Sequence, residues 1–320
     1  MTQNSLLTAK ECAKLIADTA KPIVAMHVRP DGDTVGTAVA LMAVLRALGK
    51  EPRYVCSDPI PERLLFLTNG YEAALPPYGG NVISVDVASR AQLGELAQVL
   101  NPDFMIDHHE VSTPFAPCYS IPGASSAAEV LFTVIEELIA DGKLTLTEDI
   151  AYPLYAAVSS DTGCFCYSNT APSTYRLAAL LVECGIDHAD INHRLFNSKS
   201  EEQLRAEGMT ASGIRTVAGG RIAYALISRH DRIKLGISQE HFETAIDVVR
   251  SVKGAEIAFV VKENDKGEYK ASLRSTGENV AEIAALFGGG GHIRAAGCTV
   301  AAASIDEAKD ALLRALGVGE

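Results

Sequence analysis

Short apolar runs alternate with longer helix-like runs over the first two thirds of the chain, and this alternation limits the possible folds most strongly. The expected strands are PIVAMHV (22–28), RYVCS (53–57), NVISVDV (81–87) and DFMIDHH (103–109), and the expected helices cover 34–48, 91–100 and several runs from 127 to about 196. Alternation of this kind predicts an α/β fold with a mostly parallel sheet flanked by helices. In such sheets, ligands bind at the carboxyl ends of the strands.

Acidic residues and histidines follow the ends of these apolar runs. The first run leads into HVRPDGDTVG, which contains His27, Asp31 and Asp33. The later runs are followed by Asp86 in SVDVASR, by Asp107, His108 and His109 in IDHHE, and by Asp161 in SSDTGCFCYS. Because the carboxyl ends of parallel strands lie at one edge of a sheet, we expect these side chains to gather there.

Each of these residues also has an ordinary structural explanation when it is taken alone. Asp33 could be the N-cap of the helix that follows it, and Asp31 beside Gly32 could be a turn residue. Asp86 and Asp161 could cap helices in the same way. Several carboxylates and imidazoles that converge without a cation would, however, repel one another and resist burial. Taken together, the residues therefore predict a metal site.

The types of ligand indicate which metals could bind. Carboxylates mixed with imidazole, without thiolate, favour Mn²⁺, and Mg²⁺, Co²⁺ or Fe²⁺ are also compatible. The set is too large for one closed site. It suits two ions about 3.5–4 Å apart, which activate a water molecule and stabilise an in-line phosphoryl displacement.

The sequence changes character near residue 208. The segment NSKSEEQLRAEG (197–208) is polar and is predicted to be a linker between a larger domain, 1–196, and a smaller one, 209–320. The smaller domain is expected to be mixed α/β. Its predicted strands are 221–228, 256–264 and 268–275, followed by a short helix over 279–287, the loop GGGGH, another strand and a final helix.

The loop GGGGH is a second candidate site. It comprises Gly288, Gly289, Gly290, Gly291 and His292. Glycine backbone N–H groups can approach an anion closely, and the histidine adds a donor. Arg274, on a nearby predicted strand, could bind a phosphate through its guanidinium group. The alternatives are a flexible linker and a solvent-facing charge; we interpret the group as a substrate-binding site.

Composition excludes several classes of function. The formal net charge of −12 argues against sequence-independent binding of long DNA or RNA, which needs a broad cationic surface. No apolar run approaches the roughly 20 residues that span a bilayer, so no membrane association is expected. The start of the chain does not resemble a signal peptide, and the seven cysteines include no CxxC pair. Reduced thiols and a cytoplasmic location are therefore expected.

The motifs together resemble those of the DHH phosphoesterase superfamily, named for the triplet seen here as Asp107-His108-His109. HVRPDGDTVG, Asp86, DHHE and SDTG match its four motifs, and GGGGHIRAAG resembles the glycine loop of the DHH-associated domain. The branch that the chain resembles is the oligoribonuclease/pAp-phosphatase (NrnA-type) branch. One departure is Thr37, where a serine is common, and another is the absence of a small polar residue after the DHH triplet.

The resemblance implies a role for each matching residue. His27 and Asp31 would hold one metal, while Asp33, His108 and Asp161 would hold the other. Asp86 would bridge the two ions. Asp107 would orient the histidines, and His109 would contact the scissile phosphate. Arg274, His292 and Gly288–Gly291 would hold the other end of the substrate, across a cleft between the domains.

The resemblance also implies the reaction. The expected activity is Mn²⁺-dependent hydrolysis of very short RNA oligonucleotides to nucleoside 5′-monophosphates, together with conversion of pAp to AMP, in a homodimer. A cyclic-di-AMP or pApA phosphodiesterase is the main alternative. An inorganic pyrophosphatase and a nucleotide-binding regulator with an inactive metal site are weaker alternatives, because the glycine loop argues against the first and the complete ligand set against the second.

Overall fold

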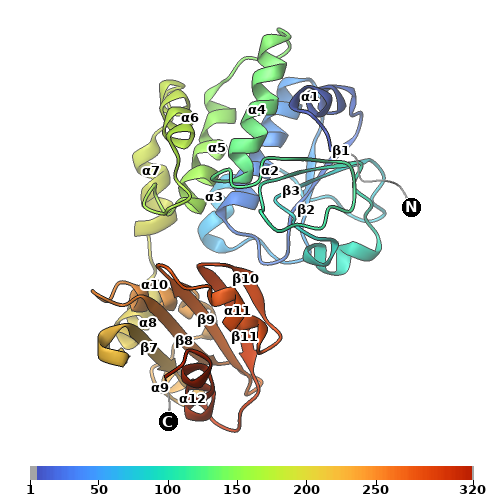
Figure 1. Ribbon diagram of the computed structural model, residues 1–320. Helices are drawn as coiled ribbons and strands as arrows, with labels where there is room; N and C mark the ends of the chain where they lie inside the picture. The colour runs from blue at the N-terminus through green and yellow to red at the C-terminus, as the bar shows by residue number, and fades with distance from the viewer. Residues whose placement is uncertain (1–5, 319–320) are drawn as a thin grey trace. The chain divides into compact units, whose positions relative to one another are not determined.

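The computed structural model describes residues 6–318 and divides the chain into two compact units, Met1–Ser198 and Lys199–Glu320 (Figure 1). The strands of the first unit are β1 Pro22–Ala25, β2 Arg53–Val55, β3 Asn81–Val85, β4 Phe104–Asp107 and β5 Cys118–Ser120. Its α-helices are α1 Ala9–Asp18, α2 Gly32–Ala47, α3 Leu65–Thr68, α4 Ala127–Ala140, α5 Glu148–Asp161, α6 Pro172–Glu183 and α7 His188–Asn192. The shorter helical segments are η1 Glu62–Leu64, η2 Arg90–Gln98 and η3 His193–Asn197.

The sheet of the first unit has five strands in the order β2-β1-β3-β4-β5, and all neighbouring strands are parallel. This confirms the predicted α/β fold with a parallel sheet. The register places Ala25 opposite both Val55 and Ser84, so the carboxyl ends of β2, β1 and β3 lie at nearly the same level. The predicted strands were too long at this edge, because β1 ends before His27 and β3 ends before Asp86. His27 and Asp86 therefore lie in the loops that leave the sheet.

Other elements of the first unit also differ from the prediction. Strand β5, helices α1 and α3 and the short segment η1 were not predicted at all. The helix expected over 91–100 is instead the 3₁₀ segment η2, which is interrupted at Gly94 with a φ of 61°. Gly94 is needed there because a Cβ atom would lie 2.5 Å from Val28 Cγ1 and 2.9 Å from Ser57 Oγ.

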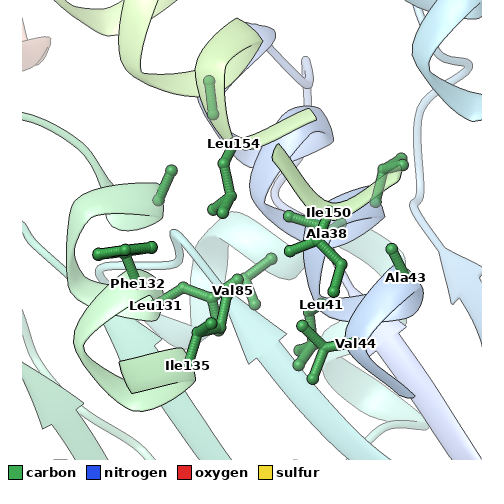
Figure 2. Close-up of a cluster of buried hydrophobic side chains, with 14 of the residues drawn as sticks. Ala38, Leu41, Ala43, Val44, Val85, Leu131, Phe132, Ile135, Ile150 and Leu154 are labelled. Carbon is green, nitrogen blue, oxygen red and sulfur yellow. The ribbon is translucent and has the colours of Figure 1, made fainter. Parts of the chain in front are cut away.

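Helix α2 is buried along most of its length, because it lies between the sheet and helix α5. Figure 2 shows Leu41 and Val44 of α2 gathered with Val85 of β3 and Leu131 of α4. An apolar helix of 16 residues could suggest a membrane segment, but here it is the centre of the core. Within residues 6–318, no helix has both the length and the apolarity to cross a bilayer.

Gly36 allows α2 to approach α5 closely. A Cβ atom at this position would lie 2.7 Å from the carbonyl oxygen of Pro153 and 2.8 Å from Ala157 Cβ. We therefore expect Gly36→Ala to destabilise the first unit by about 1–2 kcal/mol, because overpacking outweighs the better helix propensity of alanine. Calorimetric unfolding measures this change.

Gly208, in helix α8 (Glu201–Ser212), provides a matched control, because a Cβ atom there would meet nothing within 4 Å. Gly208→Ala should raise stability by about 0.5–1 kcal/mol through helix propensity alone. A gain in stability from Gly36→Ala as well would show that the contact between α2 and α5 is loose.

The second unit contains a six-stranded sheet in the order β10-β11-β9-β8-β7-β6, in which only β7 and β8 are parallel. Its strands are β6 Arg215–Val217, β7 Ile222–Ile227, β8 Ile257–Glu263, β9 Tyr269–Ser275, β10 Gly290–His292 and β11 Ala295–Val300. Its helices are α8, α9 Arg229–Lys234, α10 Ala245–Arg250, α11 Val280–Ala285 and α12 Ile305–Ala315, with the short segments η4 Ala218–Gly220 and η5 Gln239–Phe242.

Two separate apolar cores cover the two faces of this sheet. Residues of α11 and α12 belong to one core, and residues of α8 and α10 belong to the other. The segment 197–208, predicted as a linker, contains the first two turns of α8, and Ala206 of this helix is buried in the second core. The glycine loop contains the short edge strand β10, so Gly290–His292 are paired with β11 rather than forming an open loop.

Candidate metal centre

Four segments of the first unit bring the predicted ligands together. The loop after β1 and the first turn of α2 carry His27, Asp31 and Asp33; the loop after β3 carries Asp86; the end of β4 and the residues after it carry Asp107, His108 and His109; and α5 ends at Asp161. The last placement differs from the prediction, since Asp161 follows a helix and not a strand. Its contribution depends on the packing of α5 against α2, which brings the end of α5 to this edge of the sheet.

The side chains form three overlapping groups, and in each group one donor atom per residue lies within 4.8 Å of the others. The first group is His27, Asp31 and Asp86; the second is Asp33, His108 and Asp161; the third is Asp86, His108 and His109. Asp86 belongs to the first and third groups, and His108 belongs to the second and third. Two clusters of nitrogen and oxygen donors that share a carboxylate can hold two divalent cations.

Backbone carbonyl groups orient two of the imidazole rings. The Nδ1 atom of His27 lies 2.8 Å from the carbonyl oxygen of Val28, and that of His108 lies 2.9 Å from the carbonyl oxygen of Ala124. When Nδ1–H donates to a carbonyl group, Nε2 is left to face the carboxylates, as in histidines that bind metals. Nε2 of His27 is 3.3 Å from Asp86 Oδ2, and Nε2 of His108 is 3.5 Å from Asp86 Oδ1.

These contacts change the proton affinity of both rings. Burial lowers the pKa of His27, but its contacts with Asp31 and Asp86 outweigh burial and raise the pKa to about 11. Burial also opposes protonation of His108, and the three carboxylates around it raise its pKa to about 9. In the metal-free protein, protons therefore partly compensate the negative charge of the cluster.

The two aspartates of the first loop have different structural roles. Asp31, not Asp33, is the N-cap of α2, because its Oδ1 atom accepts hydrogen bonds from the N–H groups of Asp33 and Thr34 at 3.1 Å. Asp33 is 2% exposed, and its Oδ2 accepts from the N–H of Ala127 at 2.7 Å, at the start of α4. Thr37 donates to Asp33 Oδ1 at 2.9 Å. The departure from serine at position 37 thus preserves a hydroxyl donor.

Asp86 has features of a ligand that lacks its partner. Its backbone has a φ of 57°, an uncommon conformation that asparagine and aspartate tolerate better than most residues. The side chain is buried, and Oδ1 has no hydrogen-bond partner among residues 6–318. A buried carboxylate oxygen without a hydrogen bond is unfavourable, and a cation between Asp86 and the two histidines would remove this cost.

Asp107 and His109 form a pair beside the cluster. Asp107 is fully buried, and its Oδ1 atom lies 2.7 Å from Nδ1 of His109. Burial raises the pKa of Asp107, but the hydrogen bond from His109 outweighs it and lowers the pKa below its usual value. The same bond raises the pKa of His109 despite burial. The pair therefore favours the protonated form of the His109 imidazole beside the carboxylates.

The crowding of carboxylates also raises the pKa of two acids. Burial and the neighbouring Asp86 carboxylate raise the pKa of Asp33 well above its usual value. Burial is also the main cause that raises the pKa of Asp161 to about 7, and Asp86 adds to this effect. Both shifts show that this much negative charge is unfavourable without a cation, so the residues present fit divalent metal ions.

Asn169 is a residue of the site that the sequence analysis missed. Its Nδ2 atom donates to the carbonyl oxygen of Asp161 at 3.1 Å and to its Oδ2 at 3.3 Å, and also to the carbonyl oxygen of Ser125. Asn169 thereby fixes Asp161 at the end of α5. A lone asparagine in the sequence SNTAP carries no pattern that would identify it, because its role depends on contacts with distant segments.

The second predicted site lies on one edge of the six-stranded sheet. Arg274 of β9 is opposite Ala295 of β11, and Ala295 is in turn opposite His292 of β10. The structure therefore places the backbones of Arg274 and His292 on strands that flank β11. The His292 side chain, part of the predicted site, lies outside the described part of the structure.

The glycines of this segment have clear structural roles. A Cβ atom on Gly289 would lie 2.2 Å from the carbonyl oxygen of Gly297, and one on Gly291 would lie 2.4 Å from that of Ala295. Gly288 has a φ of 70°. Gly289 and Gly291 allow β10 to lie against β11, and Gly288 has a backbone conformation that favours glycine. These three glycines are therefore explained without a ligand. Gly290 has open space around its Cα atom.

Clustered carboxylates and histidines at the carboxyl edge of a parallel sheet are typical of α/β enzymes that bind metal ions. Comparison with protein families then gives two matches: residues 21–158 match the DHH family N-terminal domain, and residues 219–317 match the DHHA1 domain. The bifunctional oligoribonuclease and PAP phosphatase NrnA of Thermus thermophilus is 30% identical, over 96% of this chain and 94% of its own.

Two further comparisons extend this result. The cyclic-di-AMP phosphodiesterase GdpP of Geobacillus thermodenitrificans is 27% identical, and the match covers 95% of this chain and 48% of that protein. The crystal structure of an exopolyphosphatase-related protein from Bacteroides fragilis has a TM-score of 0.88 and 23% identity, over 97% of this chain and 95% of that one. This last similarity concerns the fold.

The chain belongs to the DHH family, with a DHH domain followed by a DHHA1 domain. It is accordingly a phosphoesterase, a hydrolase that acts on phosphoric ester bonds. The resemblance predicted from the motifs is thus confirmed.

Proposed function

We propose that this protein hydrolyses very short RNA oligonucleotides to nucleoside 5′-monophosphates and converts pAp to AMP, with two Mn²⁺ ions as cofactors. The relative in Thermus thermophilus is named for both of these activities. The small size of such substrates agrees with a net charge of −12, since a short ligand needs only a local site for its phosphates.

The observation that carries the proposal is the presence of two donor groups linked by one carboxylate. His27 and Asp31 would hold the first ion; Asp33, His108 and Asp161 would hold the second; Asp86 would bridge them. When bound, such ions supply an activated water molecule and neutralise the charge that develops on the phosphoryl group. The mixture of carboxylate and imidazole donors, without thiolate, suits Mn²⁺.

The residues around the ions would position the substrate. His109 is held by Asp107 through Nδ1, and in our proposal its ring donates to an oxygen of the scissile phosphate. Because Asp107 raises the pKa of His109, the protonated, positively charged form of this donor is favoured. Arg274, together with Gly288–Gly291 and His292, would hold the far end of the substrate.

One substrate panel tests the proposal. We expect turnover of pApA and pAp with Mn²⁺, little turnover of long RNA, and none in the presence of a chelator. Activity should return when Mn²⁺ is added in excess. Preferential hydrolysis of pyrophosphate, or activity that survives the chelator, would contradict the proposal.

A second candidate follows from the relative GdpP, which is named a cyclic-di-AMP phosphodiesterase. Cyclic-di-AMP in the same panel separates the two functions. If the cyclic dinucleotide is linearised at a higher kcat/KM than pApA is cleaved, the protein is better described as a cyclic dinucleotide phosphodiesterase.

A further inference from the structure

A cavity of about 270 Å³ lies at the carboxyl end of β2, next to the candidate metal centre. One wall is the continuous stretch 54–60, and the remainder is formed by Ala73, Ala74 and Tyr78. We propose that this cavity, here called the β2 pocket, binds the nucleobase of the nucleotide whose phosphate lies at the metal centre. This inference rests on the proposed function and adds a base-specific subsite to it.

Hydrogen bonds connect the β2 pocket directly to the first ligand loop. The Sγ atom of Cys56 donates to the carbonyl oxygen of His27 at 3.2 Å. The N–H group of Arg29 donates to Oδ2 of Asp58 at 2.7 Å. Strands β1 and β2 are neighbours in the sheet, and neighbouring strands are about 4.8 Å apart. The pocket therefore begins one strand away from the metal ligands, a separation that one sugar ring can span.

The chemistry of the lining favours a base over a phosphate. None of the residues that line the pocket within the described chain is a lysine, arginine or histidine. Asp58 contributes a carboxylate instead, which would repel a phosphate. Tyr54 and Tyr78 are the aromatic residues of the lining, and aromatic side chains are the usual partners of nucleobases.

Asp58 is also the polar group best able to read the base. The hydroxyl of Ser57 is engaged in the fold, since it donates to the carbonyl oxygen of Leu93 at 2.5 Å and accepts from the N–H of Leu96 at 3.3 Å. Asp58 uses Oδ2 for Arg29. An aspartate oxygen accepts from the amino group of adenine, cytosine or guanine, whereas uracil presents carbonyl oxygens on both sides of its single N–H. The pocket should therefore prefer bases that carry an amino group.

Ala73→Leu tests the location of the subsite. Ala73 is exposed and lines the pocket, and none of the metal-binding groups contains it. A leucine side chain there should occupy part of the cavity and raise the KM for pApA about tenfold, as expected for the loss of one stacked base. Hydrolysis of the abasic analogue of pApA should change less than twofold. Ala140→Leu, at the exposed end of α4, is the matched control and should change neither.

Equal losses on both substrates, or no loss on pApA, would overturn the inference. A binding experiment separates this outcome from a failure of the proposed function. Saturation-transfer NMR with 5′-AMP in the presence of a chelator should show transfer to the adenine protons in the wild type, and much less in Ala73→Leu. Absence of transfer, or equal transfer in both proteins, would contradict the β2 pocket as a base site even if the enzyme cleaves RNA.

Asp58→Asn tests the proposed base preference. The asparagine Oδ1 can still accept from the N–H of Arg29, while its amide group would now present donors to the ligand. We expect the wild type to cleave pApA at least several-fold better than pUpU, measured as kcat/KM. In Asp58→Asn this ratio should fall to near one. An unchanged ratio would exclude Asp58 as the group that reads the base.

Discussion

Replacing Asp86 by asparagine should lower kcat/KM on pApA at least about a thousandfold, which corresponds to about 4 kcal/mol of transition-state stabilisation. Asp86 belongs to the two donor groups that also contain His27 and His108, so both proposed ions would lose the charge that they share. Asparagine tolerates the φ of 57° at this position better than alanine does. The expected loss therefore arises from the metal centre and not from the backbone.

Stability and metal content distinguish this explanation from unfolding. The metal-free variant should unfold at or above the temperature of the wild type, because it lacks a buried carboxylate oxygen without a hydrogen bond. Metal analysis should find fewer than two bound ions per chain. Asp103→Asn is the matched control: Asp103 precedes β4 at the opposite edge of the sheet and accepts from the N–H of Val82. Wild-type activity in Asp86→Asn would contradict its role as the bridging ligand.

Metal binding should release about two protons per chain near pH 7.5. In the metal-free protein the pKa of His27 is raised to about 11 and that of His108 to about 9. Both rings are therefore protonated at this pH and must lose a proton to bind a metal through Nε2. Because each released proton changes affinity about tenfold per pH unit, affinity for Mn²⁺ should rise about a hundredfold from pH 7.5 to pH 8.5.

Calorimetric titration with Mn²⁺ in buffers of different ionisation enthalpy measures the number of protons released. The sign of the effect is fixed, because raised pKa values mean that lower pH always favours the metal-free state. Below about pH 7 the effect should become steeper, because the pKa of Asp161 is raised to about 7 and this carboxylate then also binds a proton. Binding without proton release would show that the imidazoles are neutral before the metal arrives.

Part of the fold could be predicted because it depends on local patterns. Apolar runs such as NVISV and the helix-like run from residue 34 specified a strand and a helix directly, and β3 and α2 are found there. The parts that were missed have a common reason. Strand β5 has only three residues, and the segment 91–100 bends at Gly94, where contacts with Val28 and Ser57 decide the backbone conformation.

In the candidate site, too, some features follow from local sequence patterns and others depend on packing. His27, Asp31, Asp33, Asp86 and His108 follow strand ends, so a parallel sheet was enough to predict that they would meet. Asp161 was expected for the same reason, but it arrives from the end of a helix. The identity of the N-cap was also wrong, since Asp31 has this role and Asp33 is held by α4. Both details depend on how α4 and α5 pack.

The sequence by itself determined the chemistry of this protein: which donors are present, in which order they occur, and to which family of metal-dependent enzymes the pattern belongs. Only the tertiary structure decided which carboxylate faces which imidazole, that Asn169 holds Asp161, and that a pocket lies beside β2. The physical reason is that strand and helix periodicity are local properties. Distances between side chains from separate segments are set by packing, which no single stretch of the sequence contains.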